Sequence, residues 1–268
     1  MPVGGGDHAT VGAVTGTATY GVGYERHRLG VTEATLPVSG LPPALEGTRI
    51  ALLTDIHHSA LVPAEDVVRA VALANEQKPD LVILGGDYVT AQDRAYVEPV
   101  AELLAALQAP LGVFAILGNH DDDREMPGAL ARRHMRVLKD EHTRIEVRGA
   151  GLELLGIRFW TKEQAKIAQA LKGARDPVVL LAHDPRRVVE AAALDIPVVL
   201  SGHTHGGQIV IPGLGPVAAR KFPVTAGIGS EKNTSLFVSR GIGTVYVPIR
   251  INCPPEVAIV TFRSASAL

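Results

Sequence analysis

The chain is poor in cysteine, in aromatic side chains and in net charge, and each shortage argues against a class of protein. Its one cysteine, Cys253, cannot close an internal disulfide, so nothing in the sequence marks an oxidising compartment. The 26 basic and 28 acidic side chains give a formal charge of −2, which argues against general binding of nucleic-acid phosphates. Aromatic residues make up 4% of the chain and give little support to nucleotide binding by stacking.

Long apolar runs are also missing. The uncharged stretch Ala9–Tyr24 is too short and too rich in glycine to span a bilayer. The first Lys or Arg of the chain is Arg26, so the stretch lacks the basic flank of a signal peptide. We expect residues 1–47 to form a flexible or edge-strand lead-in, or the remnant of a removed anchor, with a candidate strand at Val31–Leu36. The compact domain is expected over residues 48–268.

What the sequence does contain is a regular alternation of strand and helix patterns after residue 48. Short apolar runs at Arg49–Thr54, Leu81–Leu84 and Gly112–Leu117 are typical of strands buried on both faces. Between them, the stretches that follow Pro63 and Val97 have apolar residues at helical spacing. The strand ends recur every 32 residues, which is about the length of one strand–helix–strand unit.

The second half of the chain is richer in strand patterns. Strands are expected at residues 144–147, 152–159, 178–182, 198–201, 208–211, 236–239 and 257–262, and helices at 162–171 and 186–193. These strands are too many and too closely spaced for one flat sheet. We therefore predict an α/β fold, a four-layer αββα sandwich of two mixed β-sheets flanked by helices, with a site at the C-terminal ends of the strands.

Five of the expected strands run directly into polar residues with metal-ligand chemistry. These residues are Asp55-Ile56-His57, Gly86-Asp87, Gly118-Asn119-His120-Asp121, His183-Asp184 and Gly202-His203-Thr204-His205. In an extended segment alternate residues project to the same side, so Asp55 and His57, or His203 and His205, can reach one ion. Each group alone is equally typical of a solvated loop, a turn or a core histidine. Five such strand ends together point to one site.

In that order, these motifs resemble the calcineurin-like metallophosphoesterase superfamily, and the resemblance extends from about residue 49 to the end of the chain. Residues 201–209, 212–216, 238–243 and 252–256 resemble the bacterial branch of membrane-associated phosphodiesterases and UDP-2,3-diacylglucosamine pyrophosphatase-like proteins. Such proteins commonly carry an N-terminal anchor or a twin-arginine signal, and neither is visible here. Asp184 also departs from the branch, in which many relatives have Asn at this position.

The resemblance implies a dinuclear metal centre. Asp55, His57 and His205 would hold one ion, Asn119, His183 and His203 would hold the other, and Asp87 would bridge them. A set of oxygen and nitrogen donors without thiolate suits divalent manganese, which we expect first, and also iron, zinc, nickel or cobalt. Two such ions can generate a bridging hydroxide as the nucleophile and clamp the phosphoryl oxygens.

Three further residues and one segment are assigned less directly. The resemblance implies that His120 contacts the phosphate and protonates or stabilises the leaving oxygen. His58 is a candidate substrate contact at the rim of the site, with an outward-facing neighbour of His57 as the alternative. Tyr88 is a second candidate contact, because it lies near a predicted strand end, as do the aromatic residues Phe159 and Trp160. Residues 206–235, rich in Gly and Pro, form either an apolar wall over the metals or a surface loop with a short hairpin, and Arg220 lies within this segment.

The implied activity is hydrolysis of a phosphodiester or pyrophosphate, small or lipid-linked, by a bacterial enzyme that is soluble as read from this sequence. A cytoplasmic location and peripheral contact with the membrane or cell envelope both remain open. Three alternatives are a phosphomonoesterase of the same fold, a non-catalytic metal-binding scaffold, and a dinucleotide-binding domain. The pair Gly85-Gly86 lacks the G-x-G-x-x-G spacing that is typical of a dinucleotide-binding domain.

Overall fold

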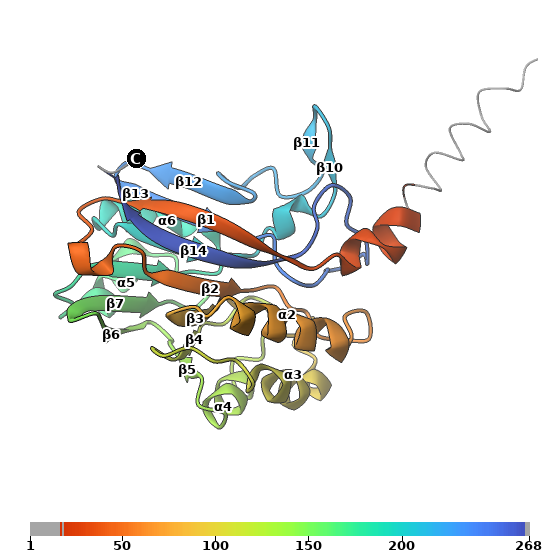
Figure 1. The fold of residues 1–268 in the computed structure, drawn as a ribbon, viewed down its shortest axis with the longest axis horizontal. Coiled ribbons are helices and arrows are strands. Elements are labelled where there is room, and N and C mark those ends of the chain that lie inside the picture. The colour runs from red at the N-terminus through yellow and green to blue at the C-terminus, as the bar shows by residue number, and fades with distance from the viewer. Residues whose placement is uncertain (1–16, 18, 266–268) are drawn as a thin grey trace, which may run out of the picture.

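Two six-stranded sheets form the centre of the protein in a computed structural model, which describes residues 17 and 19–265 (Figure 1). The first sheet has the order β1-β14-β2-β3-β4-β5 and the second the order β12-β13-β9-β8-β7-β6. Strands of the first sheet are β1 Gly30–Val38, β2 Arg49–Leu53, β3 Leu81–Leu84, β4 Val113–Ala115, β5 Arg136–Val137 and β14 Glu256–Ser264. Strands of the second are β6 Glu141–Val147, β7 Ala150–Gly156, β8 Val178–Leu181, β9 Val198–Ser201, β12 Gly227–Glu231 and β13 Thr234–Val238. Both sheets are mixed, as predicted.

Five α-helices flank the sheets. They are α2 Ala64–Glu76, α3 Val97–Leu104 and α4 Met126–Ala131 beside the first sheet, and α5 Gln164–Leu171 and α6 Val188–Ala193 beside the second. A small hairpin of β10 Val210–Ile211 and β11 Gly215–Pro216 projects from the body (Figure 1). No helix among the described residues is long and apolar enough to cross a membrane.

Three separate hydrophobic cores define the four layers. Along β2, Ala51 and Leu53 pack with α2, whereas Ile50 and Leu52 face the second sheet, because successive side chains of a strand point to opposite faces. The second core, between the sheets, contains Leu154, Leu181 and Leu200 of the second sheet. The third core packs α5 and α6 on the outer face of that sheet. The predicted four-layer sandwich is confirmed.

Helix α2 illustrates how the sequence pattern produces a layer. Its buried residues Val67, Ala70, Val71 and Ala74 recur at the three- and four-residue spacing of one helix face. Glu65 and Asp66 lie in its first turn, where the helix dipole favours acidic side chains. The helix ends before Pro79, and β3 follows it directly in parallel with β2.

Strand β1 belongs to the packed fold, although it precedes residue 48. All nine of its residues pair in parallel with β14, and it forms an edge of the first sheet (Figure 1). It contains the candidate strand Val31–Leu36, and Leu36 and Val38 enter the core between the sheets. Most of the uncharged stretch Ala9–Tyr24 lies outside the described residues.

Candidate metal centre

The polar residues that follow the strands converge at one edge of the sandwich. The loops after β2, β3 and β4 come from the first sheet, and those after β8 and β9 come from the second. Ligand atoms of Asp55, His57 and His205 lie within 4.8 Å of one another. His205 Nε2 lies 3.1 Å from His57 Nε2 and 3.3 Å from Asp55 Oδ1. All three side chains are buried.

A second group with the same compactness lies beside the first. Ligand atoms of Asp87, His183 and His203 also lie within 4.8 Å of one another. Asp87 Oδ2 is 3.1 Å from His183 Nε2, and it is 3.6 Å from His57 Nε2 in the first group. The carboxylate of Asp87 therefore lies between the two groups, the position that a shared ligand would need.

The donor atoms fit divalent metal ions. Within the described residues, Asn119 Oδ1 is buried without a hydrogen-bond partner. His183 Nδ1 lies 2.7 Å from the carbonyl oxygen of Gly85, which holds a proton on Nδ1 and directs Nε2 toward Asp87. His57 Nε2 and His205 Nε2 lie 3.1 Å apart, close enough for both rings to ligate one ion.

Burial sets the protonation states of the metal-free site. It lowers the pKa of His57 and of His203 to about 4 and that of His205 well below its usual value, so these rings are neutral and can donate lone pairs. Burial also raises the pKa of Asp55 to about 6. Burial disfavours charge on His183, but the carboxylates of Asp87 and Asp55 outweigh burial and raise its pKa to about 10. A proton on His183 thus occupies the place that a cation would take.

The backbone that carries the ligands differs from the extended geometry we predicted. Asp55 (φ 54°), His57 (52°), Asp87 (57°), His203 (72°) and His205 (51°) are all in the left-handed region, which non-glycine residues rarely adopt. The paired ligands therefore converge through tight turns after the strands and not through side-chain alternation. Such conformations persist where the surrounding contacts hold them, and they cluster at functional sites.

Hydrogen bonds from the backbone to buried carboxylates stabilise these turns. Asp121, buried beneath the site, accepts the backbone N–H of Asp87 and of Gly118 at 2.8 Å and that of Tyr88 at 2.7 Å. Asp55 accepts the N–H of His203 at 3.0 Å, which ties the end of β2 to the end of β9. Sequence reasoning noted Asp121 beside Asn119 and His120 but gave it no role.

Two glycines are required by close approach. A Cβ atom on Gly118 would lie 2.0 Å from Asp87 Oδ1, and one on Gly202 would lie 2.3 Å from Asp55 Oδ2. Both distances are far below a van der Waals contact. The strand ends can therefore bring both carboxylates into the site only because these positions have no side chain.

Arg250 is a second supporting residue that the sequence pattern did not reveal. Its guanidinium is fully buried and donates to the carbonyl oxygens of Arg240 at 2.8 Å and Gly243 at 2.6 Å. Gly243 N–H in turn donates to Asp55 O at 2.7 Å, and Arg250 also reaches His205 O at 3.5 Å. The arginine thus links the backbones of two residues in the first ligand group.

His120 lies beside both groups. Its backbone N–H donates to Asp87 Oδ1 at 2.8 Å, and its ring meets that of His57 with centroids 5.0 Å apart. Its Nδ1 accepts the N–H of Ala91 at 3.0 Å, so the neutral ring carries its proton on Nε2. The half-buried ring can therefore donate a hydrogen bond from Nε2.

The structure corrects the two predicted substrate contacts. Tyr88 is fully buried, and its hydroxyl donates to the carbonyl oxygens of Leu84 at 3.2 Å and Ile116 at 2.8 Å, so it anchors the first sheet. His58 is also buried, with Nδ1 2.9 Å from Val62 O and its ring against Tyr96 at 5.0 Å. It lies neither at the rim nor facing outward. The backbone of His58 also pairs with Val89 in an isolated parallel bridge.

Aromatic rings line the rim instead. Phe159 and Phe222 contact the His203 ring with centroids 5.1 and 5.3 Å apart, and Tyr246 contacts His120 at 5.9 Å. Phe222 belongs to residues 206–235, so this segment contributes one wall of the site. The same segment also forms the β10–β11 hairpin, on which Leu214 is exposed.

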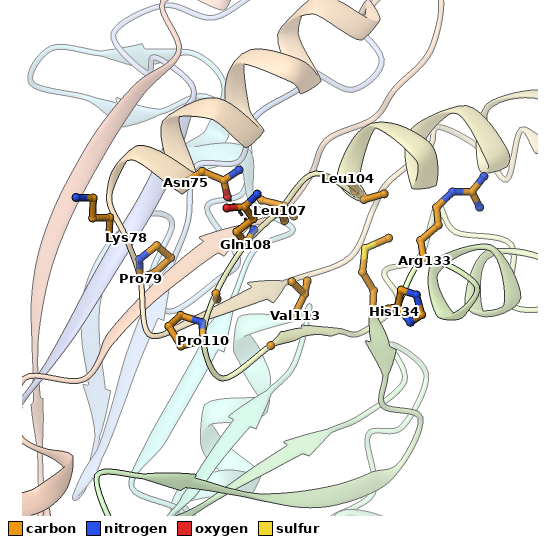
Figure 2. A pocket seen from close by; sticks show the side chains of 14 residues that line it. Asn75, Lys78, Pro79, Leu104, Leu107, Gln108, Pro110, Val113, Arg133 and His134 are labelled. Carbon is orange, nitrogen blue, oxygen red and sulfur yellow. Dashed lines mark hydrogen bonds between the residues drawn. The ribbon is translucent and has the colours of Figure 1, made fainter.

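A cavity of about 630 Å³ lies at the end of the first sheet that is opposite to the ligand groups (Figure 2). It lies between Asn75 and Lys78 at the end of α2, Leu104 at the end of α3, and Val113 at the start of β4. The polar groups of Asn75 are already paired with the backbone of Ala106 and Gln108. Because the ligand groups follow the opposite ends of the strands, this cavity does not belong to the candidate metal centre.

Comparisons with known proteins agree with this geometry. Residues 48–207 match the family model of the calcineurin-like phosphoesterases. The chain is 33% identical over 224 residues to the phosphodiesterase YaeI of Escherichia coli, covering 79% of this chain and 81% of the relative. It is 29% identical over 269 residues to the uncharacterized metallophosphoesterase YkuE of Bacillus subtilis, covering 93% and 92%.

Among solved structures, the NAD nucleotidase of Haemophilus influenzae is similar with a TM-score of 0.52 at 15% identity, over 72% of this chain and 45% of that one. At this identity the likeness concerns the fold alone. The family model covers more than half of the chain and includes the ends of β2, β3, β4, β8 and β9. The chain is therefore a member of the calcineurin-like metallophosphoesterases, a family of phosphoester hydrolases.

Proposed function

We propose that the protein is a phosphodiesterase or pyrophosphatase that depends on two divalent metal ions. One observation carries the proposal: Asp87 Oδ2 lies 3.1 Å from His183 Nε2 of its own ligand group and 3.6 Å from His57 Nε2 of the other group. The unpaired Asn119 Oδ1 supplies a further oxygen donor. The 33% identity to a relative named as a phosphodiesterase supports a diester substrate.

The residues would divide between the ions as follows: Asp55, His57 and His205 would hold one, Asn119, His183 and His203 would hold the other, and Asp87 would be shared. When bound, two divalent ions polarise water and phosphoryl oxygens, and they neutralise the charge that develops during attack on phosphorus. Donors of mixed oxygen and nitrogen type suit manganese, and also iron, zinc, nickel or cobalt. The neutral state that burial imposes on His57 and His203 prepares both rings to bind a cation.

His120 supplies the proton in this proposal. Its Nδ1 is occupied by the N–H of Ala91, so the Nε2 proton points away from that contact and is available to the leaving oxygen. The hydrogen bond from its backbone N–H to Asp87 fixes the ring relative to the shared ligand. An imidazole can regain this proton from water after each turnover.

Hydrolysis of bis-p-nitrophenyl phosphate and of p-nitrophenyl phosphate, each with and without added Mn²⁺, tests the proposal. We expect Mn-dependent hydrolysis with the larger kcat/KM for the diester. A faster monoester rate would make the protein a phosphomonoesterase instead. Absence of both activities in protein that binds two metal ions would identify it as a metal-binding scaffold.

A further inference from the structure

A cavity of about 440 Å³ opens directly beside the candidate metal centre. Leu117 and Asn119, which follow β4 of the first sheet, form one wall. Phe159 and Trp160, which follow β7 of the second sheet, form another. Because Asn119 belongs to both the cavity and the proposed ligand set, a substrate whose phosphate lies at the metals can extend one arm into this space.

The second wall is aromatic. The Phe159 ring contacts His203 at 5.1 Å and His183 at 5.9 Å, and the Trp160 ring meets Phe159 edge to face at 4.8 Å. Trp160 is nonetheless 70% exposed. Lys162 Nζ lies 5.4 Å from the Trp160 ring centroid, where a cation is attracted to the aromatic face. The indole is thus held at the cavity mouth with much of its surface free to contact a ligand.

Much of the remaining lining is charged. Arg158 and Asp140, which form an ion pair at 3.4 Å, both line the cavity, as do Asp123 and Lys166. A long acyl chain would remove these groups from water without offering them hydrogen bonds, which is unfavourable. A planar aromatic group with polar edges can stack on the indole and still leave the charges hydrated. The volume lies within the range of small-molecule sites.

We propose that this cavity binds an aromatic arm, aryl or nucleobase, of the phosphodiester substrate, with Trp160 as the stacking surface. The proposal rests on the proposed function, which places the phosphate at the metals. It makes Trp160 a specificity-determining residue, and it favours an aromatic substrate over a lipid-linked one at this side of the centre.

Trp160 is the only tryptophan of the chain, so its fluorescence reports binding without any turnover. The Mn-loaded full chain would be titrated with phenylphosphonate and with ethylphosphonate, whose carbon–phosphorus bonds resist hydrolysis. We expect phenylphosphonate to change the indole emission and to bind roughly tenfold more tightly, the usual gain from one stacked ring. Equal affinities, with phenylphosphonate leaving the emission unchanged, would overturn the proposal.

Variants examined by calorimetry separate Trp160 from the rest of the rim. Trp160→Leu should lose the preference for phenylphosphonate, and Trp160→Phe should retain most of it. Tyr246→Leu removes the ring beside His120 and should leave the preference intact. Loss of this preference in Tyr246→Leu but not in Trp160→Leu would contradict the assignment.

The same experiments distinguish failure of this inference from failure of the proposed function. If neither phosphonate binds to Mn-loaded protein, the proposed function fails as well. Equal binding of the two phosphonates, together with Mn-dependent diester hydrolysis, overturns only this inference.

Discussion

The floor of the candidate site, formed by the two ligand groups, and its rim, formed by the aromatic rings around them, differ in how firmly their residues are held. The floor consists of the proposed ligand residues, most of them buried and five of them in left-handed conformations, and hydrogen bonds to Asp121 and contacts of Gly118 leave their turns little freedom. The rim carries Trp160 and Tyr246, which are 70% and 81% exposed. The difference implies that metal binding depends on many residues acting together, whereas substrate choice depends on a few rings that can change independently.

The largest expected effect comes from the residue shared by both ligand groups. Asp87→Asn keeps the side-chain volume but removes a negative charge that two metal ions would share. We expect the variant to lose bound metal at both sites and to fall to the activity of the metal-free protein. Elemental analysis of the purified variant measures this loss, and a variant that retains two ions per chain would contradict the shared role of Asp87.

His120→Ala should lower turnover of the diester roughly 100-fold while leaving the metal content unchanged, because in the proposed function the ring donates a proton and does not hold an ion. Steady-state kinetics and elemental analysis of the same sample measure both quantities. His134→Asn is a matched control, since this histidine is exposed, distant from the centre and in a left-handed conformation that asparagine tolerates. Loss of metal in His120→Ala would make His120 a ligand instead.

Arg250→Met tests whether the buried guanidinium of Arg250 stabilises the backbone around the first ligand group. The change leaves the buried carbonyl oxygens of Arg240 and Gly243 without their donor, so we expect the free energy of unfolding to fall by about 3 kcal/mol. We also expect weaker Mn²⁺ binding that excess metal rescues. The exposed Arg263, which pairs with Glu46, is the control, and Arg263→Met should cost under about 1 kcal/mol. Urea denaturation and Mn²⁺ titration would measure both effects, and equal losses in the two variants would refute the role of Arg250.

The smallest expected effect separates a core residue from a substrate contact. Tyr88→Phe removes a hydroxyl that donates to the carbonyl oxygens of Leu84 and Ile116, so stability should fall by about 1 kcal/mol. KM for the diester should not change, because the ring is fully buried. A raised KM at unchanged stability would restore Tyr88 as a substrate contact.

The ligand residues of the floor could be predicted from the sequence because they lie at the ends of short apolar runs. Asp55, Asp87 and Asn119 follow three strands at a constant spacing, and parallel strands bring their C-terminal ends to one edge. The left-handed backbone conformations could not be predicted from the sequence pattern, because φ at Asp55 or His203 depends on contacts between the two sheets. Pattern alone predicted an extended geometry that the structure does not have.

The arrangement of the rim could not be predicted from composition or from strand ends. The low aromatic content argued against stacking, but composition does not tell where the few rings gather, and several of them surround His120 and His203. Tyr88 was assigned to the substrate because it follows a strand end, yet its side chain turns into the first sheet. Arg250 lies far along the chain from the residues it supports, so no local motif marks it.

Electron paramagnetic resonance of the protein loaded with two equivalents of Mn²⁺ tests the central claim most directly. Two ions that share the carboxylate of Asp87 would lie about 3.5 to 4 Å apart, as is usual for two-metal sites. At that distance we expect the spectrum of a spin-coupled manganese pair and saturation at two ions per chain. Saturation at one ion, or the six-line signal of isolated Mn²⁺ at two equivalents, would contradict the dinuclear centre.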